Sequence, residues 1–169
     1  IPKIIRSGDA AGRAMVTRFM VQGKLGAVEE MVIPLVEALS SKDEGERGSA
    51  LTSLIEVAHI PGVSEKIDPK PLIEILQNGP IEQKRTAAAL LANLKNAEAV
   101  PALAEAARSK DIELVRISMM ALLEMGGAKS SKAFAAHMEN DDPRMRAIAF
   151  RGLRETLPRN MALNSPMIR

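Results

Sequence analysis

Residues 111–125 read DIELVRISMMALLEM, and this stretch decides the fold. At the 3.6-residue period of an α-helix, its apolar side chains wrap almost the whole circumference. A helix of this kind has to be covered on several sides. The middle of a stack of helix pairs supplies that cover, because each helix there has a partner in its own repeat and neighbours on both sides.

Segments of the same kind recur along the chain. Each contains an arginine that follows a polar turn and precedes a run rich in alanine or leucine. These arginines are Arg13, Arg47, Arg85, Arg116 and Arg146, and successive ones are 34, 38, 31 and 30 residues apart. Periods of this length are typical of helical repeat proteins. The sequence therefore predicts an all-α fold, a right-handed α-α superhelix of about five helix pairs. We expect it to form one domain over residues 1–157, followed by a C-terminal tail at 158–169.

Turn and cap residues set the predicted helix ends. Asp111 and Asp141 are suited to N-cap the helices that follow them, and Pro143 suits a first turn. Pro34 and Pro101 lie further into their helices and are expected to kink them. The predicted helices, after a partial first one, are 9–22, 27–40, 44–58, 70–78, 81–95, 97–109, 112–125, 131–139 and 143–157.

One sequence pattern resembles the repeat of a known family. An aspartate is followed about five residues later by a basic residue and then by alanine and leucine at fixed offsets, as in Asp111 to Arg116 and Asp141 to Arg146. This pattern resembles HEAT repeats, especially the short type found in phycobilin lyase subunits and many bacterial scaffolds. The similarity covers roughly residues 9–157. As a fold the resemblance is specific, whereas this fold hosts many unrelated functions.

The repeat arginines have two interpretations. They could form a basic ladder for an anionic partner, or each could pair with the turn carboxylate or carbonyls of its own or the neighbouring repeat, as the resemblance implies. We favour the structural interpretation, because apolar residues flank each arginine and a partly buried charge needs a fixed partner. Arg116→Ala is then expected to destabilise the fold. In the third unit either Lys84 or Arg85 can hold the basic position.

Composition excludes several classes of protein. Hydrophobic residues make up 46% and aromatic residues 2%, so a helical core is favoured over a sheet. Cysteine is absent, which excludes disulfides and thiolate sites and fits a reducing compartment such as the cytoplasm. No apolar run approaches the ~20 residues of a membrane span. The chain opens at Ile1 without an initiator methionine, inside a helical pattern, as expected of a piece of a longer chain.

Catalytic patterns are sparse, and we predict no catalytic, cofactor-binding or metal-binding residue and no cofactor. The two histidines, His59 and His137, have no second histidine nearby, so an ordinary surface or half-buried role is favoured over a ligand or a base. The iron-binding hydroxylases of this fold use repeated His-Glu pairs, which this chain lacks. A phycobilin lyase-like subunit stays open as a third alternative function, and only the resemblance of the repeat supports it.

Charge is unevenly distributed along the chain. Residues 1–26 carry five basic and one acidic side chain, residues 27–60 carry two basic and seven acidic, and residues 141–169 carry six basic and three acidic. A polyanion-binding or nucleic-acid-binding module using the basic ends is therefore the main alternative function. Against nucleic acid, the net charge is only +2 and no aromatic residues are expected to be available for stacking.

The favoured function is a non-catalytic scaffold that binds protein or peptide in a concave groove lined by the second helices. Positions five and eight residues after each repeat arginine share one side of the second helix, offset from the packing positions. Arginine at both ends of this set suggests a partner with acidic segments. The predicted partner-binding residues are Arg18, Val21, Thr52, Ile55, Leu90, Asn93, Ala121, Glu124, Arg151 and Arg154.

Overall fold

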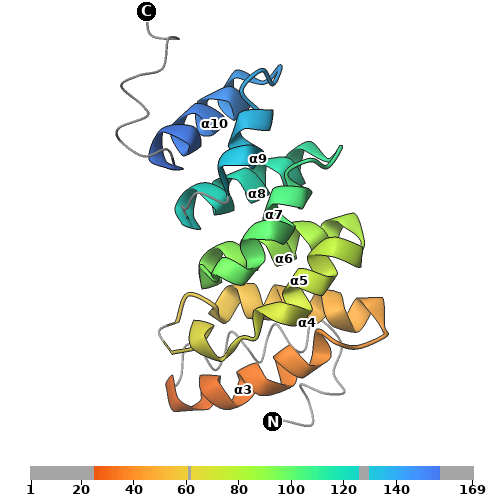
Figure 1. The fold of residues 1–169 in the computed structure, drawn as a ribbon. Helices are drawn as coiled ribbons and strands as arrows, with labels where there is room; N and C mark the ends of the chain where they lie inside the picture. The colour runs from red at the N-terminus through yellow and green to blue at the C-terminus, as the bar shows by residue number, and fades with distance from the viewer. Residues whose placement is uncertain (1–24, 61, 126–129, 157–169) are drawn as a thin grey trace, which may run out of the picture. The chain divides into compact units, whose positions relative to one another are not determined.

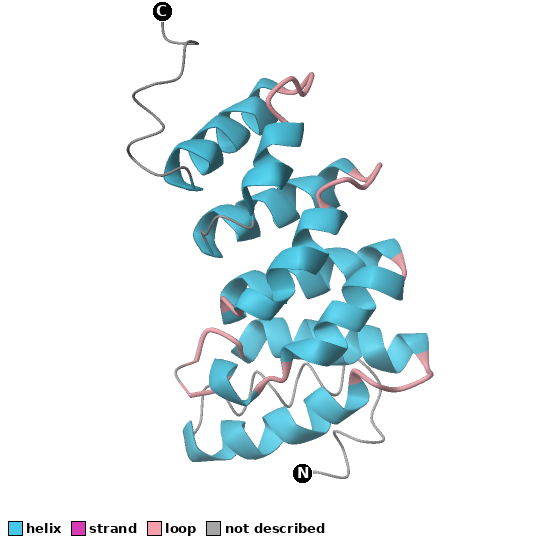
Figure 2. Ribbon diagram, viewed as in Figure 1, coloured by secondary structure: helices cyan, strands magenta, loops and turns pink. Residues whose placement is uncertain are grey.

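The computed structural model describes residues 25–60, 62–125 and 130–156, and this part of the chain is helical without strands (Figures 1 and 2). The predicted all-α class is confirmed. The predicted helix 9–22, with Arg18 and Val21, lies outside the described residues. The helices are α3 (Leu25–Ala38), α4 (Glu44–Val57), η1 (Ser64–Lys66), α5 (Pro69–Asn78), α6 (Ile81–Leu94), η2 (Ala97–Ala99), α7 (Val100–Ala106), α8 (Ile112–Met125), α9 (Ser131–Ala136) and α10 (Pro143–Thr156).

The helices form two compact units, Ile1–Leu94 and Lys95–Arg169. In the first unit α3 packs on α4, α5 packs on α6, and the two second helices α4 and α6 lie against each other. In the second unit α7 packs on α8, α9 packs on α10, and α8 lies against α10. The described part of each unit thus contains two consecutive helix pairs whose second helices are in contact, which is the arrangement of a helical solenoid.

Helix ends follow the predicted caps with two corrections. The Asp111 side chain accepts a hydrogen bond from the Leu114 amide, as predicted. At the last helix the cap is Asp142, which accepts from the Arg144 amide, instead of the predicted Asp141. Pro101 lies in the first turn of α7 and not in a helix interior, because the chain before it forms the separate turn η2. Pro34 does lie inside α3.

The four second helices are equal in length, 14 residues each, so they can be compared position by position. Their seventh positions are small and fully buried, and small side chains allow helices to approach closely. The eleventh position is leucine in all four. The seventh-position residues are Ala50, Ala87, Ser118 and Ala149.

A glycine sets the packing of the last pair. Gly152 is buried in α10, and a Cβ atom built there would lie 2.4 Å from the Phe134 ring of α9. Phe134 is itself fully buried and is the largest such side chain in the described core. The aromatic ring therefore occupies the space that any side chain at position 152 would need.

Ser118→Ala is expected to stabilise the protein by about 1 kcal/mol. The Ser118 hydroxyl is buried and has no hydrogen-bond partner among the described residues, and burying an unsatisfied hydroxyl costs on the order of 1 to 3 kcal/mol. The equivalent Ala87→Ser change should destabilise by a similar amount. Urea denaturation of both variants measures this, and a loss of stability in Ser118→Ala would mean that the hydroxyl is bonded in solution.

Candidate functional site

The basic residue of the repeat, which has a structural role, lies at the fourth position of the second helix. Arg47 donates to the Ser41 and Lys42 carbonyls at 2.8 and 3.1 Å, and Arg146 donates to two carbonyls of its own preceding turn. In α6 the position belongs to Lys84, whose Nζ lies 2.7 Å from the Gln77 carbonyl. The structural interpretation of the repeat's basic residue is thus correct for these three, since Arg47 and Arg146 satisfy carbonyls of the preceding turns and Lys84 satisfies one at the end of α5.

Arg116 is an exception, and the expectation for it is wrong. In α8 the fourth position is Val115, so Arg116 stands one residue later, on the surface. Its guanidinium pairs with Glu113 at 2.6 and 2.9 Å, and no carbonyl of the preceding turn accepts from it in the described chain. The hydrogen bonds that Arg116 donates to Glu113, followed by that carboxylate's charge, raise the pKa of Arg116 above its ordinary value. Arg116 therefore stays charged and contributes one exposed ion pair.

A glutamine joins the two second helices of the first unit. Gln83, which is buried in α6, donates from Nε2 to the Glu44 carbonyl of α4 at 2.7 Å and accepts from Arg47 Nε at 3.4 Å. Gly48 leaves room for it, since a Cβ atom there would lie 3.3 Å from Gln83 Nε2. This bridge fixes the N-terminal half of α4 against α6.

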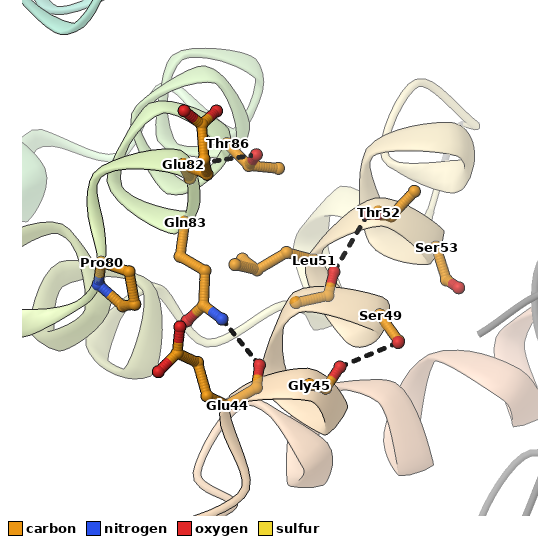
Figure 3. A pocket seen from close by; sticks show the side chains of 11 residues that line it. Glu44, Gly45, Ser49, Leu51, Thr52, Ser53, Pro80, Glu82, Gln83 and Thr86 are labelled. Carbon is orange, nitrogen blue, oxygen red and sulfur yellow. Dashed lines mark hydrogen bonds between the residues drawn. The ribbon is translucent and has the colours of Figure 1, made fainter. Parts of the chain in front are cut away.

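Beside this bridge a hollow of about 600 Å³ opens between α4 and α6 (Figure 3). The second and fifth positions of α4 are Gly45 and Gly48, where α6 carries Glu82 and Arg85. Two missing side chains lower the surface of α4 and leave helix backbone accessible. The residues that line the hollow are Glu44, Gly45, Gly48, Ser49, Leu51, Thr52, Ser53, Pro80, Glu82, Gln83 and Thr86.

The lining of this hollow presents hydrogen-bond acceptors. Ser49, Thr52 and Thr86 each donate their hydroxyl hydrogen to a carbonyl of their own helix, at 2.8, 3.0 and 3.1 Å. Their oxygen lone pairs remain available to accept. Glu44 and Glu82 add two exposed carboxylates, and the lining contains no lysine, arginine or histidine.

A smaller hollow of about 290 Å³ lies between the turn after α3 and the helix α5. Its charges are mixed, with Lys42 and Arg47 beside Glu74, and Arg47 is already bonded to the turn. The hollow between α4 and α6 is larger and lies on the predicted second-helix surface, so it is the better candidate.

The predicted partner-binding residues differ in how exposed they are in the structure. Thr52 lines the hollow and Ile55 lies half-buried one turn later, as a surface role requires. Leu90 and Ala121 are wrong as surface residues, because their exposed fractions are 0% and 1%. Counting from Arg85 and Arg116 instead of the true fourth positions moved both predictions by one residue into the core. The remaining predicted residues within the described chain, Asn93, Glu124, Arg151 and Arg154, are exposed.

The corrected count identifies the residues that were missed. The ninth position of each second helix is at least partly accessible, and it holds Thr52, Ala89, Met120 and Arg151. Met120 is 38% exposed, in place of the buried Ala121. The eleventh-position leucines align in the structure, but adjacent leucines at Leu90 and Leu91, and at Leu122 and Leu123, leave this register open by one residue in the sequence.

The last helix combines basic residues with an exposed aromatic ring. Arg151 pairs with Glu155 at 3.0 Å, whereas Arg144 and Arg154 make no ion pair with other described residues. Phe150 is 59% exposed, although the eighth position is buried in the three other second helices. The expectation that no aromatic side chain is available for stacking is therefore wrong for Phe150.

His137 has a structural role between neighbouring pairs. Its Nε2 lies 2.7 Å from the Ala107 carbonyl at the end of α7, and its Nδ1 lies 3.2 Å from Asn140 Nδ2. Both ring nitrogens are thus engaged by groups of the second unit, as favoured for a half-buried histidine. In the described ranges no three His, Cys, Asp or Glu side chains are grouped to hold a metal ion. None of the helices within those ranges has the length and apolarity needed to cross a membrane.

Comparison with known proteins agrees with this architecture. The sequence model for HEAT repeats matches residues 69–154, which is just over half of the chain. Among solved structures, the crystal structure of an engineered protein aligns with a TM-score of 0.71 and 22% sequence identity, over 91% of this chain and 76% of that chain. At this identity the likeness concerns the fold alone. No curated protein matches the sequence significantly.

Arg47→Ala is expected to lower the free energy of unfolding by about 1 to 2 kcal/mol, because two turn carbonyls and Gln83 lose a charged donor. Arg116→Ala, which removes only an exposed ion pair, should cost less than about 0.5 kcal/mol. Urea denaturation of the two variants tests the corrected register. Equal losses, or a larger loss for Arg116→Ala, would contradict it.

Proposed function

Because the chain belongs to the HEAT-repeat family, we propose that it is a non-catalytic scaffold that binds protein or peptide along the exposed face of its second helices. Solenoid proteins use extended surfaces built from equivalent positions of successive repeats. In this chain the equivalent positions are the ninth residues of the second helices and their neighbours. The hollow between α4 and α6 is the observation that carries the proposal.

Three features of the hollow support a binding role. It has a volume in the range of ligand-binding sites, about 600 Å³. Its floor is lowered by Gly45 and Gly48, although glycine in a helix interior costs about 1 kcal/mol relative to alanine. Its walls belong to two rigid helices joined by the Gln83 bridge, so a guest would meet a surface that is already formed.

A peptide selection tests this function. A random peptide display library is selected on the full chain, and the affinity of the enriched peptides is measured for two double variants. Thr52→Phe with Thr86→Phe fills the hollow with neutral bulk, because both residues line it, and should weaken binding at least about tenfold, or 1.4 kcal/mol. Arg151→Glu with Arg154→Glu changes the last helix, outside the hollow, and should weaken binding by a smaller factor. Full retention by the first variant would refute groove binding.

A second candidate function is polyanion binding by the last helix, and the exposed Phe150 favours it. On a helix, Phe150 and Arg154 are four residues apart and share a face, and an aromatic ring beside basic residues suits single-stranded nucleic acid. A gel shift with a single-stranded oligonucleotide should then weaken with salt and be lost in Phe150→Ala with Arg154→Glu, but not in Thr52→Phe with Thr86→Phe. The phycobilin lyase-like alternative has no residue of the described chain to support it.

A further inference from the structure

The hollow between α4 and α6 has a charge character opposite to that of the whole chain. The formal net charge is +2, which by itself would favour acidic partners. The hollow instead has Glu44 at one edge and Glu82 at the other, with Gln83 and Leu51 between them, as Figure 3 shows. Its preference for a guest is thus set locally and not by the overall charge.

Most of the side-chain donors within the hollow are already used. The three lining hydroxyls on Ser49, Thr52 and Thr86 give their hydrogens to helix carbonyls, and Gln83 Nε2 gives one of its two to the Glu44 carbonyl. Among the lining side chains a guest therefore meets mainly acceptors, and the side chains that complement them are donors only. Lysine and arginine have this property, since neither can accept a hydrogen bond.

The two carboxylates are not equivalent. Both oxygens of Glu82 accept from Arg85 Nη1, at 2.9 and 3.1 Å, while the Glu82 side chain is 75% exposed. The Glu44 carboxylate makes no ion pair with another described residue and stands in the first turn of α4. Glu44 thus supplies the stronger local attraction, and Glu82 can share its charge between Arg85 and a guest.

We propose that the hollow between α4 and α6 binds an extended peptide segment carrying arginine or lysine, with its basic side chains at Glu44 and Glu82 and its backbone over Gly45. This inference rests on the proposed function and names the partner's chemistry. It reverses the expectation of an acidic partner, which depended on arginines at the ends of the repeat array. Gly45 is exposed, and its missing side chain allows the close approach that a peptide main chain needs.

Short labelled peptides test the charge preference. Serine alternates in them with arginine, glutamine or glutamate, and fluorescence anisotropy measures their binding to the full chain at physiological ionic strength. We expect the arginine peptide to bind and the glutamate peptide to bind most weakly. Weaker binding of the arginine peptide than of the glutamate peptide, or no binding of it at all, would overturn the inference.

Paired glutamate variants locate the site. Glu44→Gln with Glu82→Gln should weaken the arginine peptide roughly three- to tenfold, which corresponds to two partly exposed charge pairs. The matched control is Glu98→Gln with Glu113→Gln, because Glu98 also lies in a first turn and Glu113 also pairs with an arginine three residues on. The control changes the net charge equally and should shift the affinity less than about twofold. Far-UV circular dichroism and thermal melts establish that both variants are folded.

The outcomes separate this inference from the proposed function. Equal weakening by the two double variants would mean diffuse attraction to the whole surface, and the inference falls. If the selected peptides are acidic and lose binding in Thr52→Phe with Thr86→Phe, the proposal that the groove binds peptides stands. The inference that the partner is basic is then wrong. Peptides unaffected by filling the hollow would remove both proposals together.

Discussion

Close packing of the second helices depends on a small side chain at the seventh position of each one. Ala50, Ala87 and Ala149 are fully buried there, and Ser118 takes the same place in α8. A larger side chain at this position would have to displace its neighbours, since protein interiors have little empty volume. The buried positions fix the rotation of each helix about its axis, and this rotation decides which residues reach the surface.

Polar contacts at the helix ends complete the arrangement. Carbonyls of two turns and one carbonyl at the end of α5 need donors, and Arg47, Arg146 and Lys84 supply them from the fourth position of the second helices. In the first unit Gln83 extends this network from one second helix to the other. These bonds hold the turns in place, so Arg47 and Arg146 act in the fold.

The surface that results is not uniform. In α4 two glycines leave a hollow, and in α10 arginines accompany an exposed Phe150. The same equivalent positions therefore present acceptors in the first unit and basic and aromatic groups at the last helix. Such variation at equivalent positions is how one repeat architecture serves different partners.

The sequence by itself determined the helical class and the positions of eight helices, most of whose ends were predicted to within a few residues. It also determined that the basic residue of the repeat has a structural role. Apolar periodicity, caps and alanine-rich runs are local signals, and they act within a few residues of one another. It did not determine the register of α6 and α8, because Lys84 and Arg85 are adjacent and α8 has Val115 where the base is expected. Only tertiary packing decided that Leu90 and Ala121 are buried and that Thr52 and Met120 are exposed, since a shift of one residue turns a helix position by about 100°. The hollow likewise came from two helices meeting, which no single segment encodes.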